Sequence, residues 1–189
     1  PGLRGQWRDP GGLTSSTVVL GRAESLDVRL DESAPRQPVM HYALSKVLAE
    51  DIAEFHRRRD ALDVVGLRIP LMLGPGLWYR GAAAWIQDLV QQAISGQITE
   101  TTVPAAPFDA LHVADLGSLV HKLLEGTPPP QAIYHVAGFT TSSADIVRGL
   151  QAFNAAFAPR LQTVDPPIVY PLVSQARLER DTGWQALHD

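Results

Sequence analysis

Three short segments between Leu13 and Gly76 decide the fold: LTSSTVVLG at 13–21, YALSK at 42–46 and LRIPLMLGPG at 67–76. The β-branched residues of the first segment predict a strand over 13–21. The third segment continues an apolar run, which predicts a buried strand over 62–69 that ends at Pro70. The segment between them predicts a helix, and a helix followed by a strand is typical of a parallel α/β sheet.

The predicted helix spans residues 40–59. Its apolar residues repeat at spacings of three and four, which predicts a core-facing stripe of Leu44, Val47, Leu48, Ile52 and Phe55. Tyr42 and Lys46 lie beside this stripe, so we expect them to face a cleft. Ser16 ends a short β-branched run that predicts a strand. We therefore expect its hydroxyl at the point where the strand opens into a loop.

Tyr42 and Lys46 are four residues apart in the helix, which places a phenol and an ammonium one turn apart on the same face. A phenol with a pKa of ~10 exchanges protons poorly at neutral pH, and a neighbouring cation favours its ionised form. We therefore interpret Tyr42 as a general acid/base, Lys46 as the group that tunes it, and Ser16 as a hydrogen-bond partner for a substrate oxygen. An ordinary exposed helical pair is the alternative, because Tyr-x-x-x-Lys is a common spacing.

The sequence segments that accompany Tyr42 and Lys46 form a more specific pattern. Ser-Ser-x-x-Val-x-Gly begins at Ser15, Pro-x-x-x-Tyr-x-x-Ser-Lys at Pro38, and Leu-Arg-x-Pro-x-x-x-Gly-Pro-Gly at Leu67. Three later segments continue the pattern: FDALHVADL at 108–116, AIYHVAG at 132–138 and QARLERDTGW at 175–184. In this order the segments resemble the extended short-chain dehydrogenase/reductases, the NAD-dependent epimerase/dehydratase family.

The resemblance implies an α/β fold: a doubly wound, parallel-sheet (Rossmann-like) domain with a second, smaller α+β substrate lobe. We expect residues 1–75 to be the remainder of the nucleotide-binding domain and 76–189 to be the substrate lobe, with 113–137 returning to the nucleotide-binding sheet. The family binds the cofactor pyrophosphate through a glycine-rich turn in an N-terminal half. Residues 1–12 are rich in Gly and Pro and predict a loop, not the strand and helix that this turn needs.

We therefore expect only the C-terminal part of that domain, most simply because the sequence is truncated. A stand-alone protein that has lost its cofactor is the alternative. In either case we expect this chain alone to bind NAD weakly or not at all.

The implied chemistry is hydride transfer between NAD or NADP and a carbon that bears oxygen. By resemblance, Tyr42 moves the proton at that oxygen, Lys46 also contacts the nicotinamide ribose, and Ser16 or Thr17 orients the substrate. Ile69 and Pro70 complete the expected cofactor contacts. The sequence separates neither NAD from NADP nor a reductase from an epimerase or dehydratase.

Two expected substrate-binding positions depart from the sugar-nucleotide members of the family. Leu71 stands where they carry Asn, and Phe108 where they carry an Arg that contacts the substrate diphosphate. Both changes remove charge-assisted or polar hydrogen bonds. We expect a smaller or more apolar substrate, such as a ketone, aldehyde or secondary alcohol. A sugar-nucleotide epimerase and a non-catalytic binding protein of the same fold remain the alternatives.

The composition narrows the partners. The 189 residues carry a formal charge of −4 with no local concentration of basic residues, which argues against nucleic acid. No apolar run approaches the ~20 residues of a membrane span. The chain has no cysteine, which fits the cytoplasm. A homodimer is expected by resemblance alone, because the family pairs through the helix that carries its Tyr and Lys.

The histidines suggest two other sites. His112, His121 and His135 lack the spacing of a helical zinc pair, and no carboxylate cluster joins them, so we expect no metal site. A hydrolase triad of Ser16, His112 and Asp115 lacks the Gly-x-Ser-x-Gly elbow. We interpret His112 as a structural residue at a strand-to-helix turn and the pair Asp31 and Glu32 as solvated charges.

Overall fold

The protein is described from a computed structural model that covers residues 11–76, 81–125 and 130–188. Its elements in chain order are β1 (Gly11–Ser16), the 3-10 helix η1 (Thr17–Leu20), α1 (His41–Asp60), β2 (Val64–Ile69), β3 (Leu71–Leu73), α2 (Ala84–Ser95), β4 (Glu100–Pro104), β5 (Phe108–His112), α3 (Val113–Glu125), β6 (Ile133–His135), β7 (Phe139–Thr141), α4 (Ser143–Phe153), β8 (Arg160–Val164) and α5 (Ala176–Thr182). These elements form an α/β fold, as the sequence predicts.

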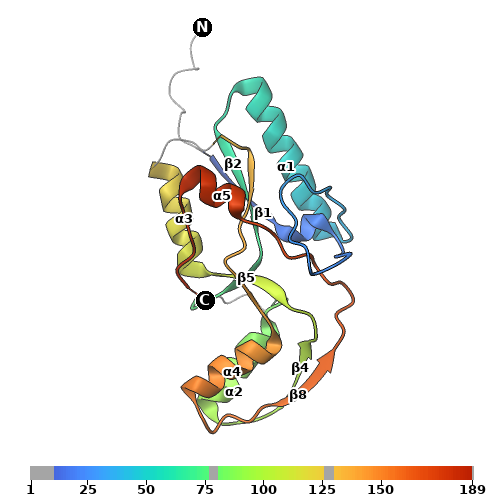
Figure 1. The fold of residues 1–189 in the computed structure, drawn as a ribbon, viewed down its shortest axis with the longest axis vertical. Coiled ribbons are helices and arrows are strands. Elements are labelled where there is room, and N and C mark those ends of the chain that lie inside the picture. The colour runs from blue at the N-terminus through green and yellow to red at the C-terminus, as the bar shows by residue number, and fades with distance from the viewer. Residues whose placement is uncertain (1–10, 77–80, 126–129, 189) are drawn as a thin grey trace.

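The first sheet contains three parallel strands in the order β1-β2-β6. Figure 1 shows α1 on one side of these strands and α3 and α5 on the other. Successive side chains of a strand point to opposite faces. Val65, Leu67 and Ile69 of β2 therefore share one face, where they pack in a core that includes Leu119 of α3 and Leu178 of α5.

A second sheet has the order β3-β5-β7 and begins one residue after β2. Leu71 of β3 pairs with Ala110 of β5, and Met72 pairs with Leu111. Met72 and Leu111 pack against the core of the first sheet. The alternation along both strands places Leu71 on the opposite face of this sheet, together with Phe108.

The remaining elements form a smaller lobe, in the lower half of Figure 1: α2 and α4 beside the parallel pair β4 and β8. Its core contains the buried side chains of Leu89, Ala93, Val103 and Phe157. Ser142 caps α4, because its hydroxyl accepts a hydrogen bond from the amide of Asp145. Among the described residues, no helix combines the length and the apolarity that crossing a bilayer requires.

The strand predicted over 13–21 is shorter than expected. It ends at Ser16, whose Oγ accepts a hydrogen bond from the amide of Val18 at 3.5 Å and so starts η1. Gly21 closes this turn with a φ of 78°, and a Cβ there would lie 2.1 Å from the carbonyl oxygen of Gln37. The loop predicted over 1–12 lies outside the described residues, except that Gly11 and Gly12 begin β1.

The core-facing stripe predicted on α1 is wrong for four of its five residues, whereas Val47 packs against the core that contains Val19 and Leu20. The other members of the stripe are exposed, by 45% for Leu44, 53% for Leu48, 60% for Ile52 and 54% for Phe55. The residues that α1 buries fully are Ala43 and Glu50. The physical reason is that the sheet presents polar side chains to α1, as described below.

The interpretation of Glu32 as a solvated charge is also wrong. Its side chain is only 2% exposed and forms an ion pair with Arg177 at 3.1 Å. Its second oxygen accepts a hydrogen bond from the amide of His135 at 2.9 Å. A buried carboxylate needs such partners, and they come from residues more than a hundred positions away, which local sequence does not reveal. Asp31 differs, since its partner is the nearby Ser33.

Candidate active site

The candidate site lies at the carboxyl ends of β1 and β2. Ser16, the last residue of β1, is the register partner of Ile69, the last residue of β2, and Pro70 follows. In open α/β sheets, ligands bind outside the carboxyl ends of the strands. Ser16 is half-buried and Thr17 is buried. Because the Ser16 oxygen accepts from Val18, its hydroxyl proton is left to donate.

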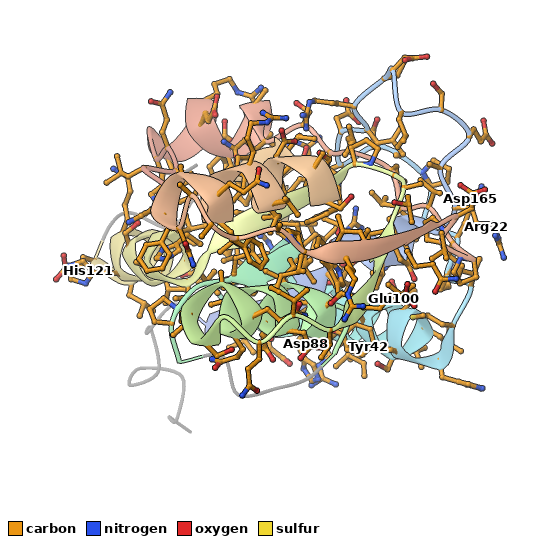
Figure 2. The ribbon with its side chains drawn as sticks, turned by 90° about the horizontal axis from the view of Figure 1, so that it is seen from below. Arg22, Tyr42, Asp88, Glu100, His121 and Asp165 are labelled. Carbon is orange, nitrogen blue, oxygen red and sulfur yellow. The ribbon has the colours of Figure 1, made fainter. Side chains whose placement is uncertain are left out.

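Helix α1 brings Tyr42 and Lys46 together beside this edge. The Lys46 ammonium lies 5.5 Å from the centre of the Tyr42 ring. It also donates a hydrogen bond of 3.0 Å to the carbonyl of Thr14, two residues before Ser16. The Tyr42 side chain is 53% exposed and lies near the edge of the molecule in Figure 2. No described residue forms a hydrogen bond with its hydroxyl, which is therefore open to a ligand.

Leu71 and Phe108 lie on the other sheet, on the face that points away from the main core. Both are half-buried. The Phe108 ring meets Trp85 of α2 edge to face, with ring centres 6.0 Å apart. The two residues thus form an apolar wall between the sheet and the smaller lobe. Leu71 and Phe108 are the two positions at which polar residues are expected in the sugar-nucleotide enzymes. Neither supplies a charged or polar side chain to this wall.

A row of buried polar residues, which was not predicted from the sequence, crosses the first sheet beneath α1. Ser15, Arg68 and His135 are register partners on three adjacent strands, and all are almost fully buried. Glu50 of α1 closes the row from above. The Arg68 guanidinium donates to both of its carboxylate oxygens, at 2.9 Å and 2.8 Å, and the Ser15 hydroxyl donates at 2.5 Å.

Arg36 reaches the same carboxylate from the loop before α1, at 3.2 Å. Burial by itself would raise the pKa of Glu50, but the hydrogen bonds from Arg68 and Ser15 and the charges of Arg68 and Arg36 outweigh it. The pKa therefore lies below its ordinary value. The carboxylate stays ionised although it is buried, which requires several partners of this kind.

His135 ends the row as a neutral residue. Burial, joined by the positive charge of Arg68, lowers its pKa to about 4. Its Nε2 lies 3.1 Å from an Arg68 nitrogen and its Nδ1 lies 3.1 Å from the carbonyl oxygen of Leu30. A guanidinium only donates and a carbonyl only accepts. These partners place the His135 proton on Nδ1.

A sequence signal for this row existed. Glu50 follows Lys46 by four residues and Tyr42 by eight, so all three share one face of α1. Arg68 interrupts a strand that is otherwise apolar, and a charge in such a strand needs a buried partner. The two signals together would have suggested a pair between Glu50 and Arg68.

The structure does not assemble the hydrolase triad. Asp115 accepts hydrogen bonds from the amides of Leu187 and His188 and from the His188 ring. His112 stacks on His188, and its Nδ1 accepts from the amide of Ala114 at the start of α3, as expected for a structural residue. Within 11–76, 81–125 and 130–188, no group of three or more His, Asp or Glu side chains is arranged to hold a metal ion.

The comparisons with known proteins identify the family of the chain. The sequence profile of the NAD dependent epimerase/dehydratase family matches residues 13–155. The chain belongs to this family. The match includes the strand that carries Ser16, the helix that carries Tyr42 and Lys46, and both positions of the apolar wall.

Among curated members of the epimerase/dehydratase family, a uronate dehydrogenase from Pseudomonas putida is 36% identical over 103 residues. That alignment covers 48% of this chain and 38% of the relative. The aligned part of the chain therefore spans well under half of the length of this relative.

Solved structures share the fold at lower identity. An L-threonine dehydrogenase from Phytophthora infestans superimposes with a TM-score of 0.86 at 17% identity, over 99% of this chain and 63% of its own. An L-threonine 3-dehydrogenase from Trypanosoma brucei gives 0.83 at 16%, over 94% and 58%. A UDP-glucose 4-epimerase from Thermus thermophilus, solved with NAD, gives 0.78 at 20%, over 94% and 59%. These likenesses confirm the Rossmann-like fold class.

Proposed function

We propose that this chain carries the Ser/Tyr/Lys part of an NAD- or NADP-dependent oxidoreductase that acts at a hydroxyl or carbonyl carbon. One observation carries the proposal. An exposed Tyr42 hydroxyl without a described partner lies beside Lys46, and Lys46 is fastened to the strand that ends in Ser16. This is the arrangement that proton transfer at a substrate oxygen needs.

The residues present fit the nicotinamide end of the cofactor. Lys46 donates one described hydrogen bond and keeps two N–H groups for ribose hydroxyls. Ile69 and Pro70, at the end of β2, would bound the same ligand beside Ser16. When bound, the cofactor accepts or supplies the hydride.

Three side chains of the site would transfer the proton and orient the substrate. Tyr42 accepts the proton from a substrate hydroxyl during oxidation and returns it to the oxygen during reduction. Ser16 donates its free hydroxyl proton to the same oxygen and orients it. Lys46 supplies a fixed positive charge beside the Tyr42 ring and fastens α1 to the strand that ends in Ser16.

The substrate is a small molecule that carries no nucleotide diphosphate. The support is the apolar wall of Leu71 and Phe108, which offers no charge-assisted hydrogen bond to a diphosphate. The uronate dehydrogenase relative makes a uronate the first substrate to test. Residues 1–75 would hold the proton-transfer residues, and most of 76–189 would form the substrate lobe, with 113–137 returning to the nucleotide-binding sheet. The helix α5, expected in the substrate lobe, packs against that sheet instead, through Leu178. A sugar-nucleotide epimerase remains the second candidate, supported by the UDP-glucose 4-epimerase fold match.

We also propose that the exposed apolar face of α1 is covered by a second copy of the chain. Leu44, Leu48, Ile52 and Phe55 form a continuous apolar stripe along three turns of the helix. Contiguous apolar residues exposed on one face of a helix are typical of an interaction surface. The resemblance to a family that pairs through this helix favours a homodimer over another partner.

The deciding experiment replaces Tyr42 by Phe in the longest natural polypeptide that contains this chain. Turnover is followed as NAD(P)H formed from a panel of uronates and secondary alcohols, and as interconversion of nucleotide sugars. Loss of the hydroxyl should lower kcat by about 10² to 10⁴, the usual contribution of a general acid/base. Because the ring is half exposed, the circular dichroism and the thermal midpoint should not change. Substantial activity in the folded variant would refute the assignment.

A further inference from the structure

Helix α1 carries three polar side chains at successive turns: Tyr42, Lys46 and Glu50. They go from half exposed at Tyr42 to almost fully buried at Glu50. These three polar residues therefore form a line along α1 from the candidate site into the interior of the molecule. The proposed mechanism uses its first two members and leaves the buried carboxylate unexplained.

Lys46 and Glu50, the two more buried of these polar residues, both bind β1. Lys46 donates to the carbonyl of Thr14 at 3.0 Å, and Glu50 accepts from the hydroxyl of Ser15 at 2.5 Å. Thr14 and Ser15 are the two residues that precede Ser16. Helix and strand are thus fastened at two consecutive residues, immediately before the residue that must meet the substrate together with Tyr42.

Glu50 is itself held rigidly. Arg68 binds both of its oxygens from β2, and a bidentate guanidinium–carboxylate pair fixes orientation as well as distance. Arg68 is the register partner of Ser15 and precedes Ile69, the partner of Ser16. The carboxylate therefore ties together the two strand ends that form the site.

We propose that Glu50 is a positioning residue: through Ser15 it sets the placement of β1 against α1, and so the separation between the Ser16 and Tyr42 hydroxyls. The proposal rests on the proposed function. If Glu50 has this role, the buried hydrogen bond of Ser15 affects kcat, because the reaction rate falls about 10²-fold when reacting groups are misplaced by ~1 Å.

The test uses Ser15→Ala, which removes the link between Glu50 and β1 and leaves the pairs of Glu50 with Arg68 and Arg36 intact. Ser15→Thr restores the hydroxyl. Thr101→Val is the matched control, since it removes another buried hydroxyl, which accepts from Gln92 at 2.8 Å in the smaller lobe. All three are compared with Tyr42→Phe in the polypeptide used above, with kcat and KM measured separately.

We expect Ser15→Ala to lower kcat by about 10- to 100-fold with little change in KM, Ser15→Thr to recover most of it, and Thr101→Val to leave it unchanged. A folded Ser15→Ala protein with wild-type kcat would overturn the proposal. Equal losses in Ser15→Ala and Thr101→Val would also overturn it, because they would show a general softening of the structure.

A second readout does not depend on turnover. In the 189-residue chain labelled with ¹³C and ¹⁵N, Ser15→Ala should shift the amide signals of Ser16 and Val18 and the ring ¹H–¹³C signals of Tyr42, and Ser15→Thr should return them. Signals of Ser16 and Tyr42 that stay in place in Ser15→Ala would overturn the positioning role. If Tyr42→Phe keeps its activity while these signals move as expected, the proposed function fails and the placement of β1 by Glu50 stands.

Discussion

The two faces of helix α1 have exchanged their usual roles. The face toward the sheet buries the carboxylate of Glu50 among Ser15, Arg36 and Arg68. The face toward solvent exposes Leu44, Leu48, Ile52 and Phe55. A surface helix of a globular protein ordinarily buries its apolar stripe.

This contrast teaches that hydrophobic periodicity locates a helix but does not say what covers each face. A helix can be attached to its sheet by charge-assisted hydrogen bonds, provided that every buried charge finds partners. Its apolar residues are then available for a surface outside the chain.

Replacing Arg68 by Met should destabilise the fold by disrupting the buried contact between α1 and the sheet. It leaves the Glu50 carboxylate without its bidentate partner in the interior, which costs about 3–5 kcal/mol for a buried pair that loses one member. Urea unfolding of the chain, followed by circular dichroism, measures the loss. The double variant Glu50→Leu/Arg68→Met should recover most of the stability, because it removes both charges. A single variant with wild-type stability would show that the pair is not buried as described.

The stability of the chain should fall as the pH is lowered from about 6.5 to 4, through His135. An unfolded His titrates near ~6.5, whereas the folded pKa is about 4. Between these values the unfolded state binds the additional proton, so stability rises with pH in this window and is lost on acidification. For the fully buried ring, the difference corresponds to about 3 kcal/mol.

The control is His135→Gln, which cannot titrate. Unfolding free energies measured at pH 7, 6, 5 and 4 should change less in this variant than in the wild type over the same window. Parallel pH profiles for the two proteins would contradict the neutral, buried state of His135. Further loss below pH 4 is expected in both, since Glu50 and Asp115 have lowered pKa values and stabilise the fold while ionised.

Replacing Leu48 and Ile52 by Gln should have the smallest effect on the fold. Both side chains are more than half exposed, so the free energy of unfolding of the monomer should change by no more than ~0.5 kcal/mol for each. Sedimentation equilibrium should show weaker self-association than in the wild type. A loss of several kcal/mol in the monomer would mean that this face is packed within the chain, and unchanged association would remove the proposed homodimer.

Local sequence patterns predicted the elements better than their surroundings. The helix over 40–59 and the strand over 62–69 were correctly located because their apolar runs have clear periods and a terminating Pro70. The strand at 13–21 was too long, because the hydrogen bond from Val18 to Ser16 turns the chain before the β-branched run ends. Propensity does not include such a side-chain cap.

The candidate site shows the same limit. The pairing of Tyr42 with Lys46 follows from helical spacing alone, and the structure places the two side chains together. The row of Ser15, Arg68 and His135 depends on strand register, which joins residues 53 and 67 positions apart in the sequence. Register is set by tertiary packing, so a single sequence without a structure gives it only indirectly.

The junction at Pro70 has a mechanical consequence. One residue separates β2, whose last residue neighbours Ser16, from β3, whose first residue belongs to the apolar wall. The ring of a proline holds its φ nearly constant. The proline therefore fixes the direction in which β3 leaves β2, so the place of Leu71 in the apolar wall is tied to the strand end beside the reacting hydroxyl of Ser16.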